Sequence, residues 1–386
     1  MPLFKRQKYE SNVFDRRYSG RINRSAGARF DWAMIFIIAL LLVIGVLNLY
    51  SAVHGSPQKE AMFYSQVQWI VICLFLMIPL ILINYQFYES SAYWIFGITC
   101  FLLIVPFFFG YSAKGAHRWV SIAGIGFQPS ELTKITLVMC LARYFVQKPS
   151  SEGYNLSQLS VPFLFVLAPF VLIIIEPDLG TAMLHMLVFG SICAFVGIKR
   201  RSVIFVSVVT VVLLPLTWLF ILKDYQRERV LTLIDPNRDP LGAGYHIRQS
   251  LLAIGSGKIF GKGYLQGTHT KLQFLPEQHT DFVFSVLAEE WGFVGGIVVL
   301  ALFFILIAWG FSVAANSKDR FGSIMAFGLS SILFWHVFIN VGMVLNIMPV
   351  VGVVLPFFSY GRTSVITMMI VVTLLMNISN RRYMFD

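Results

Sequence analysis

The stretch Met34–Tyr50, MIFIIALLLVIGVLNLY, carries no charged residue. Apolar runs of about 20 residues recur along the 386-residue chain, and each is long enough to cross a bilayer as a helix. A spanning segment must satisfy its own backbone hydrogen bonds, so only helices and closed barrels are available. Barrel strands are short and alternating, whereas these runs are long and continuous. The sequence therefore predicts an all-α polytopic membrane protein.

The composition excludes several other classes of protein. Only 13% of the residues are charged and 57% are hydrophobic, whereas about 25% are charged in a typical soluble domain. The net charge of +11 could indicate nucleic-acid binding. However, the basic residues gather at the ends of apolar runs, as the positive-inside rule describes, so no nucleic-acid partner is expected. The four cysteines lie inside apolar runs without CxxC spacing and indicate neither a metal site nor a disulfide framework.

The apolar runs and the basic clusters between them predict the topology. We expect ten spans, at residues 32–52, 67–84, 92–110, 130–147, 159–175, 179–197, 202–222, 281–312, 322–346 and 361–379. Starting inside and crossing ten times places four basic clusters in the cytoplasm, at residues 6–24, 198–201, 317–320 and 380–382. Both termini are then cytoplasmic.

One membrane domain follows from this topology. Residues 1–31 form a basic cytoplasmic tail, residues 32–379 the ten-helix domain, and residues 380–386 a C-terminal cytoplasmic tail. The N-terminal tail has no apolar core typical of a cleavable signal peptide, so the first span would act as the anchor. Residues 223–280 form a long extracytoplasmic loop between the seventh and eighth spans.

Three segments outside the spans are more than simple connectors. Residues 111–129 form an outer loop that contains the sequence HRW. Within the long loop, YHIRQSLLAIG has the apolar spacing of a short surface helix. Residues 348–364 contain two prolines and two glycines before the last span. Irregular backbone at membrane depth needs protein or a cavity around it, so we expect a partly buried re-entrant segment there.

Asp281 is the first candidate for chemistry, in the stretch FLPEQHTDFVFSVLAEEWG. A carboxylate at a helix N-terminus can be a cap, although Thr280 could serve as the N-cap instead. Glu277 and His279 precede Asp281 in a polar patch at the expected outer surface. Such a patch could hold a general base for a hydroxyl group.

Two adjacent glutamates, Glu289 and Glu290, lie deeper on the same predicted helix. At about 100° per residue, Glu289 lies some 80° around the helix from Asp281 and about 12 Å deeper, while Glu290 is on the opposite face. Both cannot face lipid, because charges within a span are costly. Each could instead make an interhelical hydrogen bond or ion pair, and packing is the better interpretation for Glu290.

Other polar candidates come from the fourth span and the outer turns. Glu131 and Lys134, at i and i+3, share a helix face and could simply neutralise each other, or form a polar cavity for an anionic group. Asp178, in EPDLG, could be a helix cap or part of the outer site. Arg118 suits a lipid head group or a phosphate. No P-loop, GxGxxG, HExxH or CxxC motif occurs, so an ATP-driven pump or zinc protease has no support.

Several of these segments, in this order, resemble the SEDS family (shape, elongation, division and sporulation). The matching stretches are GAHRWVSIAGIGFQPSELTK, EPDLGTA, DPLGAGYHIRQSLLAIGSG, FLPEQHTDFVFSVLAEE and LPFFSYG, and together they extend over nearly the whole chain. The stretches at 261–282 and 348–361 look closer to the elongation branch (RodA) than to the division branch (FtsW). One departure is Arg362, which stands where the family pattern SYGG[ST]S has glycine.

The resemblance implies a ten-span peptidoglycan glycosyltransferase that polymerises lipid II at the outer face of the cytoplasmic membrane. A class B penicillin-binding protein would supply the transpeptidase, with other elongation-complex membrane proteins and membrane lipids as further partners. The resemblance implies a catalytic Asp281. It makes substrate-binding candidates of the residues Arg118, Glu131, Lys134, Asp178, His279, Glu289 and Ser359.

In the expected reaction, Asp281 takes the proton of a sugar 4-hydroxyl as it attacks the anomeric carbon of the donor, which inverts that carbon and gives a β-1,4 link. Arg118, Lys134 and a divalent cation, Mg²⁺ or Mn²⁺, are candidates to meet the charge on the leaving diphosphate. No cofactor is required by the sequence itself. A lipid II flippase, an FtsW-type division polymerase and a recruiting scaffold are the alternatives.

Overall fold

The computed structural model describes residues 31–55, 57–113, 116–122, 125–221, 224–239 and 242–381. Their elements are α1 (Trp32–Val53), α2 (Pro57–Leu82), α3 (Tyr85–Leu102), α4 (Val105–Phe109), β1 (Tyr111–Ala113), β2 (Ala116–Ile122), β3 (Ile125–Phe127), α5 (Pro129–Gln147), α6 (Leu156–Ile175), α7 (Leu179–Val196), α8 (Arg200–Leu216), the π-helical turn η1 (Thr217–Ile221), α9 (Asp224–Ile234), α10 (Ala243–Gly257), α11 (Thr268–Lys271), α12 (Val283–Ala315), α13 (Arg320–Val344) and α14 (Arg362–Arg381). Residues 1–30 and 382–386 of the expected cytoplasmic tails lie outside the described residues.

The helices identify the chain as a multi-pass membrane protein. Within the ranges that the structure describes, nine helices are long and apolar enough to cross a membrane. Each of the ten expected spans falls on a helix, in order. The helix at the fourth expected span is α5, which carries three charged residues, Glu131, Lys134 and Arg143, and is therefore less apolar. The total of ten spans and the cytoplasmic termini stay predictions.

Helix ends differ from the expected limits where polar residues enter a helix or turns interrupt one. The helix α2 begins at Pro57, ten residues before the expected limit, because polar residues such as Lys59 and Glu60 continue the helix beyond its apolar run. In contrast, α12 begins at Val283 and not at Asp281, because residues 276–282 form turns. An apolar run therefore indicates which part of a helix can lie in the bilayer, but not the residue at which the helix begins or ends.

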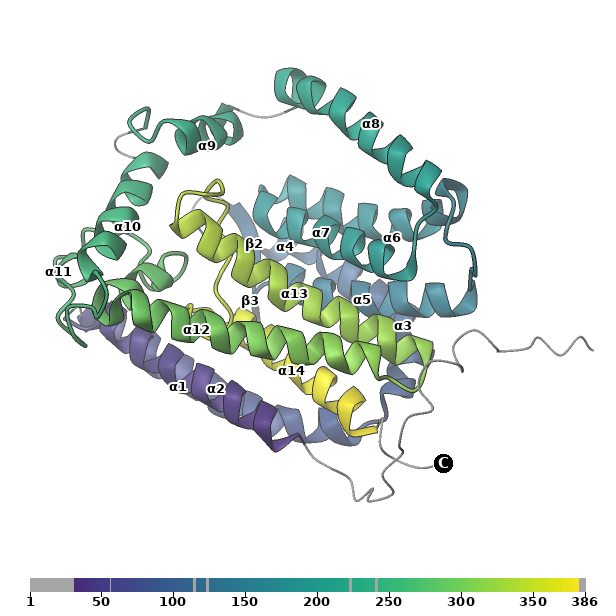
Figure 1. The fold of residues 1–386 in the computed structure, drawn as a ribbon, viewed down its shortest axis with the longest axis horizontal. Helices are drawn as coiled ribbons and strands as arrows, with labels where there is room; N and C mark the ends of the chain where they lie inside the picture. Colours follow the sequence, from purple (N-terminus) through teal and green to yellow (C-terminus); the bar gives the residue numbers. More distant parts are fainter. Residues whose placement is uncertain are drawn as a thin grey trace, which may run out of the picture.

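The core of the bundle lies around three helices, α5, α13 and α14. In the most apolar stretches of α13 and α14, 72% and 78% of the residues are buried. The helix α13 packs against α5, α7, α12 and α14, and Figure 1 shows it running beside α12. By contrast, no residue of the most apolar stretch of α8 is buried, and the helix lies apart from the others across one side of the bundle (Figure 1).

The loop between α4 and α5 forms a small sheet that the sequence analysis did not predict. Its three strands are antiparallel, in the order β1-β2-β3. The central strand β2 carries Arg118, and β3 leads directly into Pro129 at the start of α5. The sheet thereby brings the HRW sequence close to the beginning of this buried helix.

The expected irregular segment before the last helix is confirmed. Between α13 and α14, residues 345–361 form turns and extended backbone, and seven of these 17 residues, all between Val351 and Ser359, are buried. Buried carbonyl groups need partners, and α13 supplies them. Asn340 Nδ2 donates to the Val353 carbonyl at 2.7 Å, and His336 Nδ1 contacts the Val354 carbonyl at 3.1 Å. We call residues 345–361 the re-entrant segment.

Two glycines on other helices allow the re-entrant segment to enter the bundle. A Cβ atom at Gly45 of α1 would lie 2.4 Å from the Phe357 carbonyl oxygen. A Cβ atom at Gly180 of α7 would lie 2.4 Å from the Val351 carbonyl oxygen. Both distances are too short for any side chain, so backbone packs directly on backbone at these two places.

Candidate functional site

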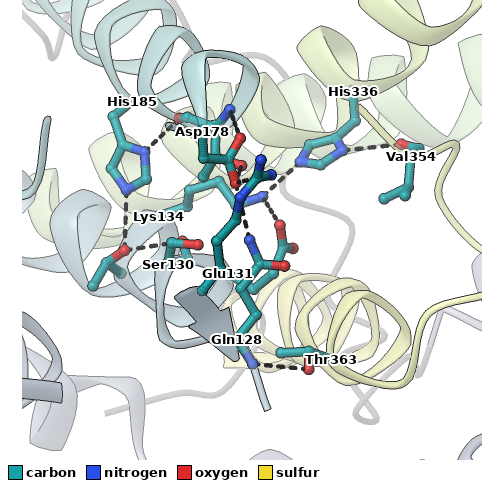
Figure 2. Close-up of polar contacts among 12 residues, drawn as sticks. Gln128, Ser130, Glu131, Lys134, Asp178, His185, His336, Val354 and Thr363 are labelled. Carbon is teal, nitrogen blue, oxygen red and sulfur yellow. Dashed lines mark hydrogen bonds and ion pairs between the residues drawn. The ribbon is translucent and has the colours of Figure 1, made fainter. Parts of the chain in front are cut away.

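A buried polar chain runs from α5 to the re-entrant segment (Figure 2). The Lys134 ammonium donates to Glu131 Oε1 at 2.8 Å and lies 2.9 Å from His336 Nε2. Because an ammonium can only donate, Nε2 accepts and the ring proton is on Nδ1. Nδ1 then donates to the Val354 carbonyl at 3.1 Å. The neutral His336 therefore links the ion pair to the irregular backbone.

The ion pair of Glu131 and Lys134 is almost inaccessible to solvent. The two residues are 6% and 1% exposed, and Glu131 Oε2 has no hydrogen-bond partner among the described residues. Their i,i+3 spacing at the start of α5 places both on one face, as the sequence predicted. Charges are retained inside a membrane domain mainly where they pair or serve a pathway. The pair compensates its own charge, and one carboxylate oxygen remains for another donor.

Asp178 is both a helix cap and the centre of a second cluster. It is the N-cap of α7, and Oδ1 accepts from the Thr181 backbone N–H at 3.2 Å. Its Oδ2 accepts from Gln128 Nε2 at 3.0 Å and from the Thr181 hydroxyl at 3.0 Å. Arg118 Nη1 lies 3.5 Å from Oδ2, while Arg118 Nη2 donates to the Pro177 carbonyl. Asp178 is therefore the cap of α7 and also contacts Gln128 and Arg118, while its part in an outer substrate site stays a prediction.

Glu176, two residues before Asp178, is a buried acid that the sequence analysis did not single out. It is 2% exposed, and neither carboxylate oxygen has a hydrogen-bond partner among the described residues. Burial and the neighbouring Asp178 raise the pKa of Glu176 to about 8, although Arg118 acts in the opposite direction. Glu176 is thus mainly neutral at pH 7.

Three further buried polar side chains were also missed. His336 and Asn340 lie one turn apart on α13, and His185 lies on α7; each is at most 1% exposed. The His185 ring contacts the Thr181 carbonyl and the Thr133 hydroxyl. The i,i+4 spacing of His336 and Asn340 within an apolar span was a signal that could have identified them.

Asp281 lies outside the ion-pair cluster, in the turn before α12. The N-cap of α12 is Phe282, and Thr280 does not cap the helix as expected, since its hydroxyl donates to the Glu277 carboxylate at 3.0 Å. The Asp281 carbonyl accepts from Asn340 Nδ2 at 2.9 Å. A Cβ atom at Gly352 would lie 3.7 Å from Asp281 Oδ2, so the carboxylate lies against the re-entrant segment.

A cavity of about 420 Å³ opens beside Asp281. Residues from four regions line it: Glu228 and Arg229 of α9, Asp239, Gly242 and His246 of the segment from α9 to α10, Glu277, Asp281 and Phe282 before α12, and Val350 of the re-entrant segment. The His246 ring stacks on Phe282, with centroids 5.8 Å apart. The cavity therefore combines several carboxylates with one guanidinium group, outside the apolar spans.

Two other predicted site residues hold the Asp281 turn in place. The Ser359 hydroxyl donates to the Thr280 carbonyl at 2.6 Å and accepts from the Leu355 N–H at 2.8 Å. The His279 carbonyl accepts from the Tyr360 N–H at 2.8 Å. Both residues thus join the turn to the re-entrant segment. Substrate contact by either stays a prediction.

The glutamates on α12 are both buried, at 0% and 2% exposure, and they point to different partners. Glu289 accepts from Lys262 Nζ at 2.7 Å, from the His269 N–H at 2.9 Å and from the Thr270 hydroxyl at 3.0 Å. Glu290 accepts from the Ser51 hydroxyl of α1. Glu289 therefore anchors the loop between α10 and α12, and its proposed contact with substrate stays a prediction.

Arg362, the departure from the family pattern, begins α14. Its Nε donates to the Ser65 hydroxyl of α2 at 3.0 Å. The neighbouring Gly361 N–H donates to Gln66 Oε1 at 3.2 Å. The guanidinium group thus ties the end of the re-entrant segment to α2.

Among the residues that the structure describes, the acidic side chains, histidines and cysteines are too dispersed to form a resident metal centre. Within the described ranges, no group of three or more His, Cys, Asp or Glu side chains could hold a metal ion. The carboxylates around the cavity therefore do not fit an ion held by protein ligands alone. The cavity itself is lined by four carboxyl groups and the Arg229 guanidinium group.

Known proteins resemble most of this chain in sequence and fold. A protein from Escherichia coli (strain K12) named peptidoglycan glycosyltransferase MrdB is 41% identical, over 92% of this chain and 95% of its own. A chain from a solved structure on the coordination of polymerization and crosslinking by a peptidoglycan synthase complex is 30% identical, with a TM-score of 0.79, and covers 92% of this chain and 99% of its own. The rod shape determining protein RodA of Thermus thermophilus is 27% identical with a TM-score of 0.68 over the same shares.

The family model for FtsW, RodA and SpoVE, described as cell cycle protein, matches residues 31–384. That range contains both polar clusters, the re-entrant segment and the long loop. The family that the sequence motifs indicated is confirmed. The chain belongs to the FtsW/RodA/SpoVE family of cell cycle proteins.

Proposed function

We propose that this protein is a peptidoglycan glycosyltransferase that polymerises lipid II during cell elongation. The observation that carries the proposal is the 41% identity to MrdB over 92% of the chain, together with an aspartate beside a cavity at the position that the family motif indicates. The likeness to RodA supports the elongation branch.

The Asp281 carboxylate is the proposed general base. It faces a cavity large enough for a sugar, and its turn is held by Asn340 and Ser359. A base must reach the proton it removes with little reorganisation, and a fixed turn provides this. The sugar 4-hydroxyl would give its proton to Asp281 while its oxygen bonds to the anomeric carbon of the donor. The bond from that carbon to the diphosphate breaks, and the anomeric carbon inverts.

The leaving diphosphate carries negative charge, so cationic side chains must contact it. Arg229 lines the cavity with Asp281, whereas Lys134 is held by Glu131 and His336. We therefore assign the first contact with the diphosphate to Arg229, with Arg118 and Lys134 as further anion-binding groups. A divalent cation, Mg²⁺ or Mn²⁺, would accompany the substrate diphosphate and neutralise part of its charge.

A class B penicillin-binding protein is the proposed transpeptidase partner, with other elongation-complex membrane proteins around it. The similar chain from a peptidoglycan synthase complex supports this assignment. We place the cavity on the outer face of the cytoplasmic membrane, where lipid II would meet it. The orientation rests on the basic clusters between the spans, such as residues 198–201 and 317–320.

The test is an assay of the purified chain with labelled lipid II, with and without EDTA. Wild-type protein should form glycan strands, and Asp281→Asn should lower the initial rate at least 100-fold, because a base typically contributes about 10²–10⁴-fold. Asp224→Asn is the matched control, since the Asp224 side chain is fully exposed on the same extracytoplasmic segment. Full polymerisation by Asp281→Asn would refute the base assignment.

Lipid II flipping is the second candidate, because a buried Glu131–Lys134 pair is a feature that a transporter could use. The same protein in liposomes distinguishes the two functions. Translocation of labelled lipid II without glycan strands would favour the flippase, and glycan strands would favour the polymerase.

A further inference from the structure

A second pocket lies on the lipid-facing side of α12, next to the loop that follows α10. Its volume is about 380 Å³. Seven residues line it: Phe260, Tyr264, Glu290, Trp291, Val294, Gly295 and Val298. None of them lines the cavity at Asp281. The pocket is therefore separate from the proposed catalytic site.

The outer walls of this pocket face the membrane. Val294 and Val298 are 45% and 49% exposed on a helix of high hydropathy, and Phe260 is 82% exposed. The Tyr264 hydroxyl donates to the Leu47 carbonyl of α1 at 3.2 Å, so the loop also reaches α1 at this point. An occupant would come from the bilayer and lay an apolar part against the valines.

Two buried polar atoms of residues that line this pocket make no hydrogen bond within the part of the chain that the structure describes. Glu290 is 2% exposed, and while its Oε1 accepts from the Ser51 hydroxyl, Oε2 has no hydrogen-bond partner among the described residues. Trp291 Nε1 is likewise buried without a partner in the part of the chain that the structure describes. An unsatisfied buried polar group is costly, and the cost is higher for a carboxyl group next to lipid. Glu290 and Trp291 both line the pocket, and each carries one buried polar atom that makes no hydrogen bond among the described residues, although the backbone of Leu265 and Gly267 also acts on the Glu290 carboxyl group.

A break in α12 creates this arrangement. Gly292 has φ 67° and ψ −164°, which separates the turns ending at Trp291 from the long apolar helix that follows. The loop fills the break, since the Phe293 N–H donates to the Lys258 carbonyl at 2.9 Å and the Gly263 N–H donates to the Glu290 carbonyl at 3.0 Å. Consequently, Glu290 and Trp291 lie where the apolar helix begins.

We propose that this pocket binds a membrane phospholipid with a primary ammonium head group, of the phosphatidylethanolamine class. The ammonium N–H groups would donate to Glu290 Oε2, and a phosphate oxygen would accept from Trp291 Nε1. An acyl chain would lie along Val294 and Val298. Phosphatidylcholine has the same phosphate and acyl chains but no N–H donor, so the pocket discriminates against it. The proposal does not depend on the glycosyltransferase activity.

The test uses native mass spectrometry of the purified full-length chain with phosphatidylethanolamine or phosphatidylcholine of identical acyl chains. Wild-type protein should bind one phosphatidylethanolamine at least fivefold more tightly than phosphatidylcholine. Glu290→Gln keeps the shape and the acceptor for Ser51 but replaces the carboxylate with an amide, and should reduce the preference to twofold or less. Val298→Phe should remove the bound lipid by filling the pocket.

Ile297→Phe is the matched control, because Ile297 is 49% exposed on the same helix but does not line the pocket. It should retain the wild-type preference for phosphatidylethanolamine.

Equal affinity for the two lipids, or a preference unchanged in both Glu290→Gln and Val298→Phe, overturns the proposal. Selective displacement by undecaprenyl phosphate would also overturn it, and would make the pocket a site for the substrate's carrier. Loss of a single-span partner protein in Val298→Phe, with lipid binding intact, would assign the pocket to a protein helix.

Discussion

At the scale of residues, similar acids have different roles because their surroundings differ. Glu289 has a complete set of donors, and Glu131 has an ion-pair partner. Glu176 has neither among the described residues, and Asp281 lies beside a cavity. The role of a carboxyl group in an apolar span or turn therefore depends on the groups around it, and not on its position in the sequence.

Because its pKa is raised by folding, Glu176 makes the free energy of unfolding depend on pH. Its pKa is about 8 in the folded protein and near 4.5 when unperturbed, so the folded state binds the proton more tightly. Stability is then fully present below about pH 4.5 and falls as pH rises to about 8, where the loss levels off. Glu176→Gln should remove this loss, on the order of a few kcal/mol.

The measurement for Glu176 is thermal unfolding in detergent between pH 5 and pH 9. The Gln variant should melt close to wild type at pH 5 and clearly higher at pH 9. Glu152→Gln is the control, because the Glu152 side chain is 81% exposed and should leave the pH profile unchanged. An identical decline in wild type and Glu176→Gln would show that another group carries the pH dependence.

At the scale of elements, the break at Gly292 decides how α12 meets the loop. The combination of φ 67° and ψ −164° is one that essentially only glycine adopts. A Cβ atom there would also lie 2.3 Å from Gly261 N and 2.5 Å from the Ile259 carbonyl oxygen. Substitution must therefore distort the backbone pairing that holds the loop against the helix.

Gly292→Ala should lower stability by about 1–3 kcal/mol from backbone strain alone, with the steric clash adding to this. The apparent melting temperature of the purified protein measures the effect. Gly190→Ala is the control, because nothing lies within 4 Å of its added Cβ atom in the middle of α7. It should be neutral or stabilising by about 0.5–1 kcal/mol. Equal melting temperatures for the two variants would contradict this account of the break.

At the scale of the whole molecule, the re-entrant segment connects the two polar regions. On one side, the Val354 carbonyl meets His336, which meets Lys134. On the other side, Asn340 Nδ2 donates both to the Val353 carbonyl and to the Asp281 carbonyl. Because His336 and Asn340 are one turn apart on α13, this helix fixes the turn that carries Asp281 relative to the buried ion pair.

Asn340→Leu tests this connection. Leucine occupies a similar volume but donates no hydrogen bond, so two buried carbonyl groups lose a donor, at about 1–3 kcal/mol each. We expect a lower melting temperature and, well below it, at least a tenfold lower rate of lipid II polymerisation. Phe338→Leu is the control on the same helix, since Phe338 is 45% exposed. A wild-type rate in Asn340→Leu would mean that α13 does not position Asp281.

The sequence alone determined the helical membrane fold, the family, the irregular segment before α14 and the i,i+3 pairing of Glu131 with Lys134. These features depend on apolar length, on helical periodicity and on motifs that are contiguous in the chain. Only the tertiary structure decided that Glu289 binds the loop, that Glu176 is isolated among the described residues, and that Asn340 holds Asp281. The contacts of Glu289 with Thr270 and of Asn340 with Asp281 join residues 19 and 59 positions apart. Packing decides such contacts, because the partner of a buried polar group depends on which distant backbone and side chains reach it.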